Sequence, residues 1–217
     1  MKNKRLFMIL GVLGVIIISI FAAGYYLNEQ FNERIINNGN LIIGNGNVTS
    51  QEVNVSGFDS VDLNGVADIT IHPSEDYKVI VTTDSNIQDN VVITSKNNSL
   101  YISSKNDKFT TKELTIDIYM PNLKSVRLKG VGNLKISKGK ATDLEIIQKG
   151  VGDIDTQDYE VENVNITLSG TGNIKTWATK TLTGKLSGLG DVLYKGNPFV
   201  KVDINGVGDV RKIQGIN

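Results

Sequence analysis

Apolar and polar residues alternate along most of the chain after residue 40. Val126-Arg127-Leu128 and Leu144-Glu145-Ile146 place an aliphatic residue at every second position, and Val164 to Leu168 and Val200 to Ile204 extend the pattern. A period of two with branched aliphatic residues is typical of β-strands that bury one face. No stretch after residue 28 shows a convincing helical period. The pattern therefore predicts an all-β fold.

A glycine motif follows these strands at nearly constant spacing. It reads glycine, a usually apolar residue, glycine, Asp or Asn, then an aliphatic residue. The first glycines stand at positions 130, 150, 170, 188 and 206, which gives steps of 20, 20, 18 and 18 residues. The predicted structural corners are Gly130, Gly132, Gly150, Gly152, Gly170, Gly172, Gly188, Gly190, Gly206 and Gly208. Weaker copies lie upstream at Gly65–Ile69 and Gly44–Val48. A fixed step of this length indicates stacked structural repeats.

Each repeat is too short to hold a strand, a helix and two turns, so we expect a strand, a glycine corner, a second strand and a return. Successive coils would pair in parallel about 4.8 Å apart, with the aliphatic side chains stacked inside. Glycine would supply corner backbone angles that a side chain forbids. The sequence thus predicts a parallel β-helix over residues 41–217, a solenoid of roughly 18–21-residue coils.

Residues 70–120 interrupt the repeat. Lys78 to Thr82, Leu100 to Ile102 and Leu114 to Ile118 still read as strands, but no glycine corner lies between Gly65 and Gly130. Either divergent coils or a small antiparallel insertion could fill this stretch. The polar segment Ser103 to Lys112 favours a hairpin-like excursion.

The N-terminal residues have a different character. Lys2, Lys4 and Arg5 precede an uncharged apolar run from Leu6 to Ala23. As a helix this run would measure about 27 Å, close to the roughly 30 Å hydrocarbon core of a bilayer. We expect residues 1–28 to be a cytoplasmic basic flank and a transmembrane signal-anchor, and 29–40 to be a tether. A cleaved signal peptide is the alternative, although Phe21 would then occupy a position that prefers a small residue.

Composition narrows the possible functions. Lysine plus arginine and aspartate plus glutamate number 23 each, so no net charge favours nucleic acid as a partner. The absence of cysteine excludes thiol chemistry, cysteine-ligated zinc and lipid attachment to cysteine. His72 is the single histidine, so there is no histidine cluster. We expect no cofactor and no enzymatic activity.

Several motifs resemble the head GIN domain family of auto-transporter adhesins. They are Phe58-Asp59-Ser60-Val61-Asp62-Leu63, Tyr119-Met120-Pro121-Asn122-Leu123, Gly196-Asn197-Pro198 and the ordered series of glycine corners. The resemblance covers roughly residues 41–217 and implies a right-handed β-helix at a bacterial cell surface. It carries over no catalytic or ligand-binding residue. The single predicted N-terminal helix departs from auto-transporter secretion, so that label does not transfer.

The Asp or Asn of each corner should form a column along the coils. In consecutive coils its members are Asn133, Asp153, Asn173, Asp191 and Asp209. One interpretation is structural, with each side chain hydrogen-bonded to the neighbouring turn. The other is a calcium site, because related glycine–aspartate repeats bind calcium. Adjacent carboxylates occur only at Asp191 and Asp209, which are therefore weak candidates for a cation or for a raised pKa.

Other candidate residues give weaker signals. Asp191 and Asp209 could also serve as paired carboxylates in glycoside hydrolysis, but their corner positions are explained by the repeat. His72 beside Pro73 is expected in a polar turn. Trp177, between Lys175 and Lys180, could stack on a sugar, but it more readily covers the edge of a coil.

These features favour a non-catalytic protein, anchored in the cell membrane by one span, with its C-terminal domain outside the cell. The expected role is an adhesin, or a binding protein at the envelope surface, for a polysaccharide or an envelope protein. The alternatives are a structural or envelope-stress-associated membrane protein that acts through protein partners and, more remotely, a polysaccharide-active enzyme. The sequence does not indicate an oligomeric state.

Overall fold

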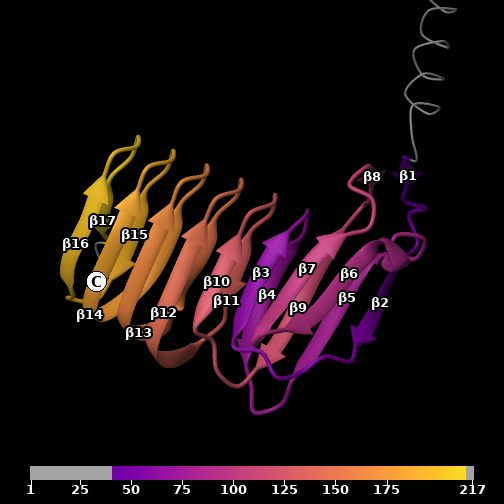
Figure 1. Ribbon diagram of the computed structural model, residues 1–217, viewed down its shortest axis with the longest axis horizontal. Coiled ribbons are helices and arrows are strands. Elements are labelled where there is room, and N and C mark those ends of the chain that lie inside the picture. Colours follow the sequence, from indigo (N-terminus) through magenta and orange to yellow (C-terminus); the bar gives the residue numbers. More distant parts are fainter. Residues whose placement is uncertain (1–40, 214–217) are drawn as a thin grey trace, which may run out of the picture. The chain divides into compact units, whose positions relative to one another are not determined.

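The computed structural model describes residues 41–213. The chain divides into two compact units, Met1–Ile42 and Ile43–Asn217, and the second unit holds the sheet. Its elements are β-strands of unequal length and one 3-10 turn (Figure 1). In chain order they are β1 Ile42–Ile43, β2 Val48–Val53, β3 Ser60–Asn64, β4 Asp68–Pro73, β5 Lys78–Asp84, η1 Gln88–Asn90, β6 Val91–Lys96, β7 Ser99–Ser104, β8 Phe109–Thr110, β9 Leu114–Met120, β10 Ser125–Leu128, β11 Leu134–Ile136, β12 Gly139–Gln148, β13 Ile154–Leu168, β14 Ile174–Leu186, β15 Val192–Lys195, β16 Phe199–Ile204 and β17 Val210–Lys212.

Fifteen of these strands form a single sheet, and β1 pairs separately with β8. The path through the sheet runs β2-β5-β9-β4-β11-β13, then returns through β12-β10-β3-β7-β6. It returns because β13 is long enough to pair with β11 at its beginning and with β12 over the rest of its length. β14 similarly pairs with β15 and then with β16. The sheet therefore folds back on itself and nearly closes around one core.

Aliphatic side chains stack between the two facing parts of the sheet. One interior row joins the same position of five strands in parallel register: Ile69, Leu134, Ile154, Ile174 and Val192. Each member is at most 2% exposed. A fully buried side chain of this kind stabilises the fold by about 1.5–3 kcal/mol relative to an exposed one. These rows explain why period-two alternation predicts the strands of this chain correctly.

The predicted right-handed parallel β-helix is wrong. The structure is one nearly closed sheet of mixed strand direction, because β5 pairs antiparallel with both β2 and β9, and β6 pairs antiparallel with β7. The two-residue turn Asn97-Asn98 joins β6 to β7 with positive φ angles of 50° and 60°. Two such residues are typical of the type I′ turn, which reverses the chain at once and prevents continued winding in one direction.

Residues 70–120 do not lie between the corners that flank them in sequence. The corner at Gly65 stacks directly on the corner at Gly130, and the backbone N–H of Val131 donates to the Gly65 carbonyl at 2.8 Å. The intervening strands extend the sheet on the far side of β3 and β4, where β7 and β9 continue the parallel rows. The glycine series at Gly44–Val48 is not part of the stack, which begins at Val66 among the described residues.

The predicted transmembrane signal-anchor at 1–28 and the tether at 29–40 lie outside the described residues. Within residues 41–213, no helix has the length and apolar character needed to cross a membrane.

Candidate functional site

The glycine corners form a continuous stack along one edge of the sheet (Figure 1). The central residue of each corner makes a parallel bridge to the same residue of the next corner. These central residues are Val66, Val131, Val151, Thr171, Leu189 and Val207. Because every corner repeats the same backbone path, their side chains project in one row, and we name this row the corner ridge.

The two glycines of each corner are required for different reasons. A Cβ added at Gly150 would lie 1.9 Å from the Gly130 carbonyl oxygen, so the first glycine is required by the close approach of two coils. Gly152 meets a similar obstruction and also has a φ of +134°, which side chains strongly disfavour. Ala67 replaces the second glycine only at the first corner of the stack. At that corner a Cβ added to Gly65 would lie no closer than 3.6 Å to neighbouring backbone atoms.

A ladder of Asp and Asn side chains holds successive corners together. The Oδ1 atom of Asp153 accepts the backbone N–H of Asn173 at 2.7 Å, and Oδ1 of Asn173 accepts that of Asp191 at 2.9 Å. The same bond recurs from each member to the next along Asp68, Asn133, Asp153, Asn173, Asp191 and Asp209. The column therefore has the side-chain-to-turn hydrogen bonds that the structural interpretation of these residues describes.

The corner ridge is unusually exposed for a row of aliphatic side chains. Val131, Val151 and Leu189 are 50–53% exposed, and Val207 is 70% exposed. The hydroxyl-bearing Thr171 stands between Val151 and Leu189 in this row. Single exposed aliphatic residues are common on protein surfaces, but several of them aligned in one row are typical of an interaction site. The ridge is therefore the strongest candidate for a functional surface among the described residues.

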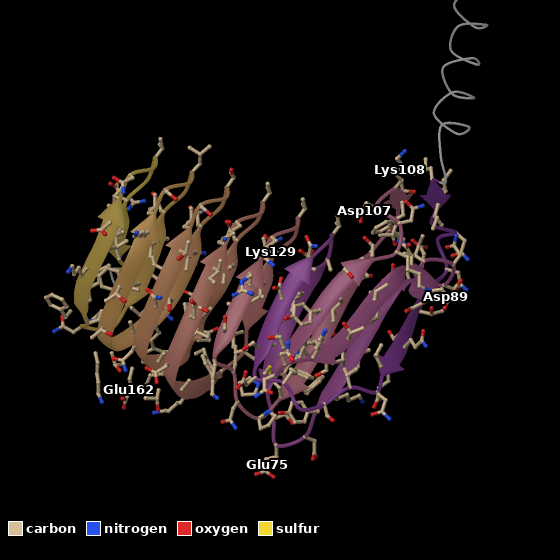
Figure 2. All side chains as sticks on the ribbon, viewed as in Figure 1. Glu75, Asp89, Asp107, Lys108, Lys129 and Glu162 are labelled. Atoms are coloured by element: carbon tan, nitrogen blue, oxygen red, sulfur yellow. The ribbon has the colours of Figure 1, made fainter. Side chains whose placement is uncertain are left out.

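An open groove of about 740 Å³ runs beside the corner ridge. Its floor is the stacked backbone of the first corner glycines, and its mainly apolar wall is the ridge from Val131 to Val207, in which Thr171 is the polar member. Its second wall consists of the residues that precede these glycines: Lys129, Lys149, Ser169, Ser187 and Asn205. Figure 2 shows Lys129 at the base of the row of corner loops. We name this feature the corner groove.

A buried carboxylate fixes one lysine of the groove. Asp62 is 4% exposed, and its Oδ2 atom lies 3.1 Å from both Lys129 Nζ and Arg127 Nη1. Two cations therefore share one buried anion, and the cluster keeps a net positive charge beside the groove. Within residues 41–213 the Lys149 ammonium has no hydrogen-bond or ion-pair partner, so its charge is directed at solvent.

The Asp191 carboxylate has structural partners on both of its oxygens. Asp191 accepts the Asp209 N–H at Oδ1 and pairs through Oδ2 with Arg211. The Asp209 N–H and then the Arg211 guanidinium hold the pKa of Asp191 below its usual range, so the raised pKa considered for this carboxylate is wrong. No cluster of three or more potential metal ligands occurs within residues 41–213.

His72 lies at the end of β4 rather than in a turn. Its Nε2 atom is 2.8 Å from Asp117 Oδ1, its Nδ1 atom is 3.1 Å from Ser137 Oγ, and its ring stacks on Tyr119. A serine–histidine–aspartate chain resembles a hydrolase relay, although the Ser137 N–H donates to the Ile71 carbonyl and is not available to an oxyanion. The hydrogen bonds connect the neighbouring strands β4 and β9 and the residue that follows β11. Sequence reasoning missed it because the three residues are far apart in the chain.

Trp177 lies in β14 between Glu160 of β13 and Lys195 of β15, so it does not cover an edge as expected. It is half-buried, and Lys195 Nζ lies 6.0 Å from the centre of its ring. It does not line the corner groove. The groove itself was not predicted from the sequence, although the recurring exposed residue between two glycines was the available signal.

Comparison with known proteins matches the chain to a family described as "Putative auto-transporter adhesin, head GIN domain", over residues 57–138 and again over 125–198. Comparison with curated proteins gives no match. Among solved structures, a putative adhesin from Bacteroides fragilis has a TM-score of 0.57 at 23% identity, covering 79% of this chain and 100% of that one. A putative lipid binding protein from Parabacteroides distasonis has a TM-score of 0.47 at 21% identity, covering 81% and 100%.

The Bacteroides fragilis structure shows that the fold is shared, and the two family matches overlap over residues 125–138, which include the corner at Gly130. Together these matches extend over residues 57–198, which is more than half of the chain. The chain therefore belongs to the head GIN domain family, whose members are described as putative auto-transporter adhesins.

Proposed function

We propose that this protein is a non-catalytic adhesin of the cell surface that binds its partner through the corner ridge and the adjoining groove. Membership of an adhesin family supports the surface role. The observation that carries the proposal is the exposure of the ridge, where four aliphatic side chains are each at least half exposed: Val131, Val151, Leu189 and Val207. A folded protein that keeps such a row in water gains by covering it with a ligand.

The rigidity of the corners supports a binding role. Both backbone polar groups of a ridge residue bond to the preceding corner: the Val151 N–H donates to the Gly130 carbonyl at 2.9 Å, and the Val151 carbonyl accepts the Gly132 N–H at 3.0 Å. A surface that is already ordered loses little conformational entropy when it binds. The ligand that we propose at this level is a polysaccharide or a protein of an envelope surface.

The basic and apolar residues at the N-terminus support membrane anchoring. Three cations before an uncharged run favour a cytoplasmic start and an extracytoplasmic C-terminal domain. In this proposal the anchor holds the adhesin at the cell that makes it, and the corner ridge binds the partner.

The test uses cells that display the full-length chain and surfaces coated with isolated envelope material. We expect these cells to adhere more strongly than cells without the protein. Replacing Val151→Ser and Leu189→Ser should remove most of the gain, because both changes remove apolar contact area without emptying the core. Ile43→Ser is the control, since Ile43 is 59% exposed but lies away from the corners. Equal adhesion by all variants at equal surface expression would contradict the proposal.

A further inference from the structure

The two walls of the corner groove differ in chemistry. The corner ridge supplies four aliphatic side chains and Thr171, whereas the opposite wall supplies two ammonium groups, two hydroxyls and a carboxamide. None of the residues that line the groove is acidic. A matching ligand therefore needs an apolar side, a hydrogen-bonding side and negative charge.

The groove also repeats along its length. The five glycines that line its floor follow one another at the spacing of neighbouring strands, about 4.8 Å. The groove therefore extends over about 19 Å from the first glycine to the fifth. Each step presents the same backbone with one ridge residue and one polar residue. A repeating linear polymer can repeat its contacts in such a groove, but a compact ligand cannot.

The hydrogen bonds of the corners argue against a peptide strand as the ligand. The N–H groups of Val131, Val151 and Leu189 donate to carbonyls of neighbouring corners. Their main chain therefore has no free N–H for β-strand addition, the usual source of affinity for extended peptides. A bare acyl chain fits no better, because one wall of the groove is polar along its whole length.

From this geometry we propose that the corner groove binds a linear acidic polysaccharide. The inference rests on the proposed adhesive function and names its ligand class. The C–H faces of successive sugar rings pack on the corner ridge, and their hydroxyls bond to Ser169, Ser187 and Asn205. Carboxylates of the sugar pair with Lys129 and Lys149 at the other end of the groove. The advance per sugar of an extended chain is close to one step between corners.

The probe is a short oligogalacturonate with free carboxylates, and its fully methyl-esterified form is the matched neutral ligand. The full-length chain is held in nanodiscs, and binding is measured by calorimetry or interferometry. We expect the acidic form to bind at least tenfold more tightly than the ester. Its affinity should weaken as salt is raised, because exposed ion pairs are screened.

Two lysine variants locate the site. Lys149→Gln removes one groove charge and should weaken acidic-oligomer binding several-fold, while leaving the Tm unchanged. Lys185→Gln removes an exposed lysine outside the groove and should leave the affinity unchanged. Val151→Ser should weaken binding without changing its salt dependence.

The remaining outcomes separate this inference from the proposed function. Equal affinity for the acidic and esterified oligomers, or equal effects of the two lysine variants, would overturn the acidic-glycan assignment. If no oligomer binds but ridge variants still reduce adhesion, the adhesin proposal stands and the ligand assignment fails. If full-length protein binds anionic phospholipid vesicles through the ridge instead, a membrane is the partner and the inference is wrong. If ridge variants affect neither assay, both proposals fail.

Discussion

At the residue scale, individual side chains matter here through close backbone packing and through a few buried polar contacts. The corner glycines are required where one coil meets the carbonyl oxygens of the next. Gln148 is fully buried in an otherwise aliphatic interior row, and its Nε2 donates to the carbonyls of Gly152 and Thr171. It therefore ties two successive corners from the inside, which an aliphatic residue at this position cannot do.

Substitution of the first glycine of a corner should lower the free energy of unfolding more than a substitution that only strains φ. Gly150→Ala places a Cβ 1.9 Å from a carbonyl oxygen and should destabilise the fold by about 3 kcal/mol. Gly46→Ala is the comparison, because Gly46 has a φ of +76° but no atom within 4 Å of its Cβ position, and it should cost about 1 kcal/mol. Chemical denaturation measures both free energies of unfolding. A larger effect at Gly46 would show that the coils separate easily.

Asp84 should make the stability of the fold depend on pH. The Thr111 hydroxyl, followed by the Lys112 N–H, lowers the pKa of its carboxyl group. A carboxyl group whose pKa is lower in the folded than in the unfolded state stabilises the fold at pH values above its unfolded pKa of about 3.9. This stabilisation is lost as the pH falls through the folded pKa. We therefore expect Asp84→Asn to lower the Tm by a few degrees at pH 7, with the difference narrowing below about pH 4.

Asp89→Asn is the matched control for Asp84→Asn, since Asp89 is exposed in η1. It should leave the Tm unchanged across the same pH range. Thermal melting followed by circular dichroism measures all three proteins. A difference for Asp84→Asn that is independent of pH would assign its effect to packing rather than to charge.

At the element scale, the strands and corners form two kinds of continuous row. Interior aliphatic rows fix the register of the strands, because a slip of one residue would move every buried side chain to the outer face. The Asp and Asn ladder fixes the register of the corners independently, through side-chain oxygens bonded to backbone N–H groups. The corner ridge is straight because both rows agree in register.

Removal of one ladder oxygen should weaken two neighbouring corners. Asp153→Ala loses the acceptor for the Asn173 N–H and should destabilise the protein by about 1 kcal/mol. Asp153→Asn keeps an oxygen at the same place and should cost much less. Hydrogen exchange at the Asn173 amide gives a local readout, and we expect faster exchange only in the alanine variant. Equal exchange in both variants would show that the side-chain bond does not protect this corner.

At the scale of the whole molecule, the nearly closed sheet holds a rigid groove, and the N-terminal sequence suggests how it is attached to a cell. These two parts lead to separate measurements, because the proposed anchor would fix the location of the protein and the proposed binding groove would select its ligand. The fold itself gives no information on the N-terminal segment, which lies outside the described residues.

We expect the anchor to be retained. The protein in the membrane fraction should have the mass of the full chain, and protease added to intact cells should remove the C-terminal domain. A cytoplasmic marker protein, which should remain intact, controls for cell lysis. A mature form that begins near Gly24 and is released into the medium would show that the N-terminal segment is a cleaved signal peptide.

The strands, the corners and the family can all be read from the amino-acid sequence. Alternation at Val126 to Leu128 and Leu144 to Ile146 identifies strands because burial on one face of a sheet requires a period of two. The pairs of glycines mark the corners because no other residue fits the close approach of the coils there. These signals are local, so each is visible within a few neighbouring residues.

The connections between strands and the surface available for binding depend instead on tertiary contacts. The sequence does not show that the Gly65 corner stacks on the one at Gly130, because residues 70–120 intervene and contain strands of similar composition. Of the two alternatives for this stretch, the antiparallel one occurs, since β5 pairs antiparallel with β2 and β9 and β6 pairs antiparallel with β7. The corner groove exists only once five corners are aligned, since each contributes one glycine, one ridge residue and one polar residue. Long-range pairing depends on contacts between distant residues, and a local pattern does not specify them.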